Sequence, residues 1–363
     1  MQNDMKAQDF PTWQMRRFLA HLNARAWPGL PRLMGMSWRR ARARARAFGN
    51  ARVSNAIAAY ENGEIANFRD LKIVTSVIAL TRDHQRYEDS LRLFDDTLSL
   101  PGARGRAAFV GYGIGGGSLN VYRTIGGARF EKIYLRKSAC LRRMSFAYAE
   151  ILPRLRDLRT PALLETGKGE RIAVARFEAI TPRPVPHFDL EAAVEAVQAF
   201  AALDLSDISI PPDIRNFRKK GYGNGQEILF TRIRRRHPTR AEALIEGVQR
   251  LEKRVAACPG VFAHGDLNRT NFAADGHVID WDSAGVYPYG FDAAYVANQS
   301  TRFSDIAQLE AFFGRYFERP GEAEEDRIAF LFFFLHFMQN LPRQRTNHML
   351  FDQLLERLDG VPG

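Results

Sequence analysis

The residues whose types and spacing could do chemistry lie in "FAHGDLNRTNF", from Phe262 to Phe272. Counted from His264, Asp266 and Asn271 stand at the spacing H-x-D-x-x-x-x-N. The segment is either an ordinary polar turn or a loop that holds a metal ion and a reacting hydroxyl group. Phosphoryl transfer needs a carboxylate that accepts the nucleophile's proton and oxygen ligands for magnesium. The two residues would supply one of each, the base at the start of the loop and the metal ligand at its end.

The segment that follows predicts a second oxygen ligand. "FAADGHVIDWD" is typical of a tight hairpin in which Asp275 and Gly276 form the turn and the returning strand ends at Asp280. That return would place Asp280 beside Asn271. Magnesium takes one or two hard oxygen ligands from side chains and otherwise keeps its waters, so this pair is sufficient. Asp282 has two interpretations: contact with substrate or metal, or a cap on the next turn.

A glycine-rich segment upstream predicts a nucleotide-binding loop. Gly111, Gly113 and Gly116 satisfy G-x-G-x-x-G, but a dinucleotide fold requires a helix after the glycines. Here they lead into the β-branched "SLNVYRTIGG", so the loop connects two strands, as over the triphosphate in kinase-like folds. A plain glycine-rich hairpin is the alternative. On the kinase-like interpretation we expect Gly113, Gly115, Gly116 and Ser118 to contact the nucleotide.

The third strand of the same region should offer one lysine to the α- and β-phosphates, and the next helix one glutamate to orient it. Lys132 in "FEKIY" and Glu150 in "FAYAEIL" occupy these positions. Lys137 is a rival lysine at the strand end, where a solvated cation is the simpler interpretation. Glu131 points to the opposite face of its strand and is expected to be solvated.

The elements that must position these residues indicate an α+β protein of two lobes. Three antiparallel strands are expected within "RAAFVGYGIGGGSLNVYRTIGGARFEKIYLRK", a helix from about Ala139 to Leu158, and one or two strands within "GERIAVARFEAI". Helical patterns dominate after Asp189. Strands first and helices afterwards favour the α+β class. The expected parts are a basic, mostly helical N-terminal region at 1–105, a sheet lobe at 106–182 and a helical lobe with the catalytic loop at 183–363.

Three motifs together resemble a known family. "HGDLNRTNF", "VIDWDSAG" and "YGFDAAYV", in this order, resemble the signature of the aminoglycoside phosphotransferase and choline kinase superfamily, whose fold is similar to that of protein kinases. The resemblance covers roughly Ala107 to Asp292. It implies ATP and Mg²⁺ as cofactors, Asp266 as catalytic base, and Asn271 and Asp280 as magnesium ligands.

The resemblance also implies supporting roles. Lys132 would anchor the phosphates with Glu150 as its partner, His264 would support the loop, and Asp292 would hold the catalytic segment through backbone hydrogen bonds. Two features depart from the family pattern. The hairpin after Asn271 is shorter than usual, and a helical extension of roughly 100 residues precedes the sheet lobe.

Composition limits the number of domains, the charge of the partners and the cellular compartment that we expect. The 363 residues suit two or three packed units, and 52 basic against 41 acidic residues favour acidic partners. Cys140 and Cys258 lie far apart, which argues against a disulfide framework or a zinc site and favours a cytoplasmic protein. The longest apolar run, from Ala329 to Met338, is too short to span a bilayer and predicts a buried helix in which His336 belongs to the core.

The N-terminal region carries five arginines between positions 39 and 46, and no acidic residue occurs from Phe10 to Tyr60. It is either a solvated basic helix or arm, or a segment that makes peripheral contact with an anionic membrane surface, which would put the protein at the inner face of the membrane. No specific nucleic acid is expected as a partner.

The phosphate acceptor is the least determined feature. We expect a hydroxyl of a small molecule: a sugar, an amino alcohol or a cell-envelope glycan intermediate. The acidic "ERPGEAEED", from Glu318 to Asp326, would either face an amine or complement a helix N-terminus. A choline-type site would need an aromatic cage, although an aromatic core explains the candidates equally well. These candidates are Trp281, Tyr287, Tyr289, Phe312 and Tyr316.

A function of a different class remains open beside the kinase. The chain would then be a non-catalytic nucleotide-binding or scaffolding protein whose basic N-terminal region binds anionic lipid or nucleic acid. The complete set of Lys132, Asp266, Asn271 and Asp280 counts against this alternative.

Overall fold

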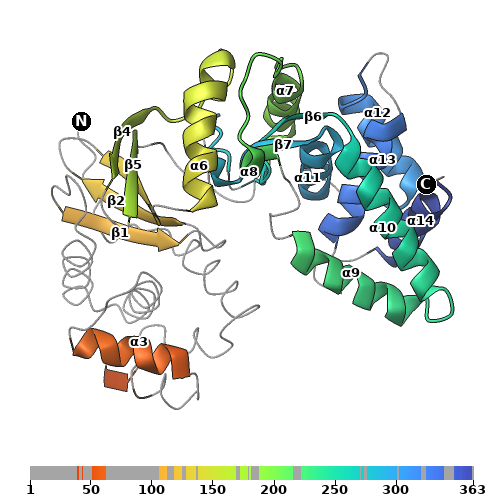
Figure 1. The fold of residues 1–363 in the computed structure, drawn as a ribbon, viewed down its shortest axis with the longest axis horizontal. Coiled ribbons are helices and arrows are strands. Elements are labelled where there is room, and N and C mark those ends of the chain that lie inside the picture. The colour runs from red at the N-terminus through yellow and green to blue at the C-terminus, as the bar shows by residue number, and fades with distance from the viewer. Residues whose placement is uncertain are drawn as a thin grey trace. The chain divides into compact units, whose positions relative to one another are not determined.

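The chain forms two compact units, one comprising Met1–Ser138 and Ala162–Ala179 and the other Ala139–Pro161 and Ile180–Gly363. One unit contains an antiparallel sheet and the other is mostly helical, which confirms the predicted α+β class (Figure 1). The predicted boundaries at 105 and 182 stay a prediction. The computed structural model describes residues 39–40, 43, 51–62, 106–112, 118–124, 128–135, 138–168, 172–178, 180, 188–215, 222–269, 271–273, 276–300, 302–319, 324–338 and 347–361.

The sheet of the first unit has five strands, all paired antiparallel in the order β1-β2-β3-β5-β4. The three strands predicted around the glycine-rich segment are confirmed, and two more follow. A helix of the same unit, α3 (Ala51–Glu61), buries Val53, Ala56 and Ile57. The strands are β1 (Arg106–Tyr112), β2 (Ser118–Thr124), β3 (Ala128–Leu135), β4 (Leu163–Lys168) and β5 (Ile172–Glu178).

Both faces of this sheet are covered at β3 and β5. Successive side chains of a strand point to opposite faces, yet the neighbours Glu131 and Lys132 are 3% and 4% exposed. Glu131 lies opposite Arg176 in the strand register, and its Oε1 accepts a hydrogen bond from Arg176 Nε at 2.9 Å. The expectation of a solvated Glu131 was therefore wrong. Strand alternation assigns a side chain to one face, but it does not tell whether that face is covered.

The helix that follows β3 begins where the sequence predicts and ends earlier. An α-helix, α6 (Ala139–Phe146), continues as a π-helical turn, η3 (Ala147–Ile151), and a 3-10 turn, η4 (Leu152–Arg154). The prediction extended it to Leu158. Pro153 explains the difference, because proline lacks the backbone N–H that would continue the helix and its ring clashes with the preceding turn.

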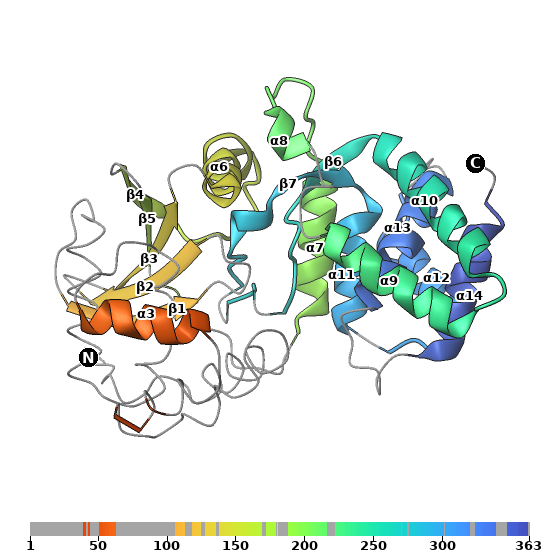
Figure 2. The same ribbon diagram turned by 60° about the horizontal axis from the view of Figure 1, so that its bottom comes forward.

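The second unit packs its helices around a short two-stranded antiparallel sheet. Its strands are β6 (Gly260–Ala263) and β7 (Gly285–Pro288), separated by the 3-10 turn η6 (Trp281–Ser283). Helix α11 packs against both α7 and α13 (Figure 2). The helices are α7 (Leu190–Ala201), α8 (Pro212–Arg215), α9 (Tyr222–Arg236), α10 (Ala241–Ala257), α11 (Gly290–Ser300), α12 (Ile306–Tyr316), α13 (Glu324–Phe337) and α14 (His348–Asp359).

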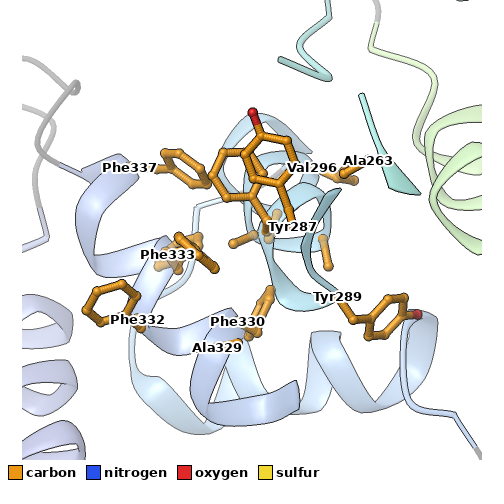
Figure 3. Close-up of a cluster of buried hydrophobic side chains, with 14 of the residues drawn as sticks. Ala263, Tyr287, Tyr289, Val296, Ala329, Phe330, Phe332, Phe333 and Phe337 are labelled. Carbon is orange, nitrogen blue, oxygen red and sulfur yellow. The ribbon is translucent and has the colours of Figure 1, made fainter. Parts of the chain in front are cut away.

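Helix α13 is the predicted buried helix. Its phenylalanines gather in the core of the helical unit, among them Phe330 and Phe333 (Figure 3). His336 lies within this core with Nδ1 2.9 Å from the carbonyl oxygen of Phe332, and burial lowers its pKa to about 4. Within the described part of the chain, no helix combines the length and the apolar character needed to cross a bilayer.

Close approach of α11 and α13 depends on one glycine. A Cβ added at Gly290 would lie 2.3 Å from the backbone nitrogen of Phe330, so any larger residue there must push the two helices apart. Gly290 begins α11, the helix that carries Asp292 and Tyr295 toward the loop after β6.

Candidate active site

One buried carboxylate holds the backbone of the loop after β6. Asp292, in the first turn of α11 and 2% exposed, accepts hydrogen bonds from the backbone nitrogens of His264 at 2.7 Å and Gly265 at 3.0 Å. Gly265 has a φ of 74°, a left-handed conformation that glycine adopts without a steric penalty. The anchoring role predicted for Asp292 is confirmed.

The imidazole of His264 ties the two ends of the loop together. The backbone nitrogen of Asp266 donates a hydrogen bond to His264 Nδ1 at 3.2 Å, so Nδ1 carries no proton. Nε2 therefore carries it and donates to the carbonyl oxygen of Ile279 at 2.9 Å. The ring, fully buried, also packs against the indole of Trp281 with a centroid separation of 4.7 Å. The supporting role predicted for His264 is confirmed.

Asp266 is held by hydrogen bonds to its side chain and to its backbone. Its Oδ1 accepts from the hydroxyl of Tyr295 at 2.8 Å and from Asn268 Nδ2 at 3.0 Å. Its carbonyl oxygen accepts from Asn271 Nδ2 at 2.7 Å. The contact with Tyr295 was not among the sequence-based predictions. The only available signal was its position three residues after Asp292, which places both on one face of α11.

The segment after Asn271 forms the predicted hairpin. Phe272 and Val278 make an isolated antiparallel bridge, and the backbone nitrogen of Ile279 donates to the carbonyl oxygen of Asn271 at 2.9 Å. Asp280 thus follows directly after the residue that pairs with Asn271, as the sequence predicts. Gly276 has a φ of 86°, consistent with its predicted place in the turn, while residues 274–275 lie outside the described part.

The side-chain oxygens of Asn271 and Asp280 are chemically suited to bind a magnesium ion. Because Asn271 Nδ2 donates to the carbonyl oxygen of Asp266, the amide's Oδ1 is turned the other way, as an oxygen ligand requires. Amide and carboxylate oxygens are the hard ligands that Mg²⁺ prefers. Among the described residues, no group of three or more His, Cys, Asp or Glu could hold a metal ion.

Asp280 has an unusual backbone. Its φ of 70° and ψ of 57° are left-handed, and among the described residues it is the one non-glycine residue with positive φ. Such a conformation costs on the order of 1–3 kcal/mol and is concentrated at functional sites. This left-handed conformation changes the direction of the chain between the hairpin and η6.

The predicted nucleotide-binding residues are only partly described. Lys132 is buried on β3, with Nζ 5.8 Å from the ring centroid of Tyr134. Glu150 is exposed on η3 and belongs to the other unit, so its pairing with Lys132 stays a prediction. Ser118 is the first residue of β2, and its side chain is outside the described part. The loop glycines Gly113, Gly115 and Gly116 also lie outside the described residues.

Three of the aromatic candidates for an amine cage are core residues. Trp281, Tyr287 and Tyr289 are 1%, 1% and 2% exposed. The hydroxyl of Tyr289 donates to the carbonyl oxygen of Phe317 at 2.8 Å, and burial raises the pKa of Tyr287 far above its ordinary value. The aromatic-core interpretation is confirmed for these three.

The acidic cluster before α13 also has a structural explanation. Glu325 and Asp326 lie in the first turn of α13, where negative charge favours the helix N-terminus. Each accepts a hydrogen bond from an arginine at 2.8 Å, Glu325 from Arg254 and Asp326 from Arg319. These contacts support the helix-dipole interpretation. Asp282 lies on η6, half-buried, and both of its interpretations remain.

The chain is similar to a known enzyme family and to several solved structures. Residues 113–331 match the model of a phosphotransferase enzyme family. No curated protein sequence matches the chain. Among solved structures, amicoumacin kinase hAmiN, in complex with AMP-PNP, Ca²⁺ and Ami, is 14% identical over 76% of this chain and 94% of its own, with a TM-score of 0.47. Aminoglycoside-3'-phosphotransferase of type VIII is 21% identical over 69% and 98%, with a TM-score of 0.43. Aminoglycoside phosphotransferase APH(3'')-Id from Streptomyces rimosus is 16% identical over 71% and 98%, with a TM-score of 0.44.

Proposed function

The chain belongs to the phosphotransferase enzyme family, and we propose that it transfers the γ-phosphate of ATP to a hydroxyl group of a small molecule. The observation that carries this proposal is the loop around Asp266. Its carboxylate is held in place by Tyr295 and Asn268, and the hairpin returns the chain to Asp280 next to Asn271. A turn without function would not need this many convergent polar contacts around one aspartate.

The roles follow from phosphoryl-transfer chemistry. Asp266 accepts the proton of the acceptor hydroxyl as that oxygen bonds to the γ-phosphorus and the bond to the β-phosphate oxygen breaks, releasing ADP. Asn271 and Asp280 would hold Mg²⁺, which neutralises charge that develops on the phosphate oxygens. In the same proposal, Lys132, oriented by Glu150, and the glycine-rich loop hold the phosphates of the nucleotide.

For the acceptor, the charges of the chain favour a neutral or anionic alcohol over a polycation. The formal net charge is +11, and two of the three acidic residues in the first turn of α13, Glu325 and Asp326, accept hydrogen bonds from arginines. We therefore propose that the acceptor is a sugar or an envelope glycan intermediate. An amino alcohol is the second choice, and an aminoglycoside is the least favoured. We also propose a cytoplasmic reaction near the inner face of the membrane, because the five arginines at 39–46 suit an anionic surface.

Turnover of ATP with Mg²⁺, measured over a panel of hydroxyl compounds, tests this function. The variant Asp266→Asn keeps the size of the side chain and removes the base, so kcat should fall by about 10²- to 10⁴-fold. Asp207→Asn is the matched control, because Asp207 is a surface carboxylate that pairs with Arg154. Asp280→Asn should instead raise the Mg²⁺ concentration needed for half-maximal turnover.

Two outcomes would contradict the proposed function or the role of Asp266. If the purified full chain turns over no compound of the panel, yet binds anionic vesicles or RNA in a salt-sensitive way, the non-catalytic alternative replaces the kinase. Equal turnover by Asp266→Asn and the wild type would remove Asp266 as the base.

A further inference from the structure

Tyr295 makes a direct hydrogen bond to the proposed base. Its hydroxyl donates to Asp266 Oδ1 at 2.8 Å, a contact that joins residues 29 positions apart. Tyr295 lies on α11 one turn beyond Asp292, which holds the backbone of the same loop. One helix therefore fixes both the backbone path of the loop and one oxygen of its carboxylate.

The ring of Tyr295 is itself held firmly. It packs edge to face on Phe337 of α13 with a centroid separation of 4.6 Å, and Phe291 lies 6.5 Å away on α11. A tyrosine has few rotatable bonds, so packing on its ring fixes the position of its hydroxyl. The hydroxyl thus acts as a rigid donor rather than a mobile surface group.

Two donors converge on the same oxygen of Asp266. Oδ1 accepts from Tyr295 and from Asn268 Nδ2, whereas Oδ2 lies 3.4 Å from Asn271 Nδ2, a long and weak contact. Two short hydrogen bonds to one oxygen fix the rotation of a carboxylate about its terminal torsion, which is otherwise broad.

We propose that Tyr295 is a positioning residue that orients the Asp266 carboxylate for receiving the proton of the acceptor hydroxyl. The inference rests on the proposed phosphotransferase function. Tyr295 touches the base and acts through it, so its loss should change the chemical step more than the binding of nucleotide. Misplacing a reacting group by about 1 Å costs on the order of 10²-fold in rate.

The test compares Tyr295→Phe with Tyr289→Phe. Both remove one tyrosine hydroxyl that donates at 2.8 Å, but the hydroxyl of Tyr289 donates to a backbone carbonyl, that of Phe317. With MgATP and the best alcohol of the panel, or water if no alcohol reacts, Tyr295→Phe should lower kcat by about 10- to 100-fold with the KM for MgATP unchanged. Tyr289→Phe should leave kcat at the wild-type value. Crystal structures of both variants should show a rotated Asp266 carboxylate only in Tyr295→Phe.

The outcomes separate this inference from the proposed function. If the wild type is active and Tyr295→Phe matches it in kcat and in carboxylate orientation, the positioning role is overturned while the function stands. If the wild type is inactive but the carboxylate rotates in Tyr295→Phe alone, the proposed function fails and the orienting role holds. A lower kcat shared by both tyrosine variants would indicate a general loss of packing and would also overturn the inference. Asn268→Ala, which removes the second donor to Oδ1, supplies an independent variant with the same expected direction.

Discussion

The carboxylate of Asp292 accepts the backbone N–H of His264 at 2.7 Å and that of Gly265 at 3.0 Å, so a buried side chain of α11 determines the path of the loop after β6. The carboxylate stabilises this loop path because one side chain satisfies the backbone N–H groups of two neighbouring residues. Each donor uses a different oxygen of the carboxylate, Oδ2 for His264 and Oδ1 for Gly265.

Replacement of Asp292 by Asn should therefore lower both stability and activity. An amide offers one oxygen and presents an NH₂ group where the second backbone N–H requires an acceptor. We expect the free energy of unfolding, measured by urea denaturation, to fall by about 2–3 kcal/mol. Asp189→Asn is the control, since Asp189 caps α7 through the backbone nitrogen of Ala192 and Asn caps equally well. Equal losses in the two variants would contradict the special role of Asp292.

The contact of Gly290 with α13 predicts opposite effects for two glycine-to-alanine changes. At Gly290 the new methyl group would meet the backbone of Phe330, so Gly290→Ala should cost about 1–3 kcal/mol. At Gly314, inside α12, the nearest atom to a Cβ is a carboxylate oxygen of Glu318 at 3.4 Å. Gly314→Ala should therefore stabilise by about 0.5–1 kcal/mol through helix propensity. Thermal denaturation of both variants distinguishes the effects, and an unchanged Tm for Gly290→Ala would disprove the close packing.

Removing one partner of the ion pair between Glu131 and Arg176 should lower the free energy of unfolding strongly, whereas replacing both partners by apolar residues should lower it less. Both side chains are 4% exposed, and Arg176 also pairs with the exposed Glu165 at 3.0 Å. Arg176→Met, which removes the arginine from the buried Glu131, should therefore cost about 3–5 kcal/mol, and Glu131→Leu should cost less because Glu165 still pairs with Arg176. The double variant should be more stable than either single variant. Glu242→Gln is the comparison, because its pair with Arg234 is exposed and screened by solvent, so its loss should change stability little. A urea double-mutant cycle measures the coupling, and additive losses would rule out a coupled pair.

The buried imidazole of His336 predicts a loss of stability in mild acid. Burial lowers its pKa from 6.5 to about 4, so between these values the unfolded chain binds a proton that the folded chain does not. Stability therefore falls as the pH drops from about 6.5 to about 4, by up to about 3 kcal/mol from this residue. His336→Leu should flatten the pH dependence of the free energy of unfolding in this window. The same slope in variant and wild type would show that His336 does not titrate there.

The parts of the site that sequence predicts are those encoded locally. The loop spacing and the hairpin lie within seventeen residues, from His264 to Asp280, so the pairing of Asn271 with the strand that leads to Asp280 could be deduced from turn chemistry. The anchoring by Asp292 came from the family resemblance. The Tyr295 contact could not be predicted, because it depends on which face α11 turns toward the loop, and tertiary packing decides that.

The fold shows the same limit. Strand and helix types followed from residue patterns, but the burial of Glu131 depends on what covers the second face of the sheet. The early end of the helix that begins with α6 follows from Pro153, a local signal that the predicted helix to Leu158 did not take into account. Local chemistry therefore predicted the types of elements, and the errors lie where distant segments meet or where two local signals compete.

The packing of Trp281 against His264 has a spectroscopic consequence. The indole follows Asp280 directly and lies 4.7 Å from the imidazole that links the two ends of the loop. Indole fluorescence responds to the polarity of its surroundings and to a neighbouring imidazole. With Trp13, Trp27 and Trp38 replaced by phenylalanine, the remaining emission comes from within the site. The chain thus carries an intrinsic fluorophore with which the proposed binding of a nucleotide and a metal ion can be tested without an added dye.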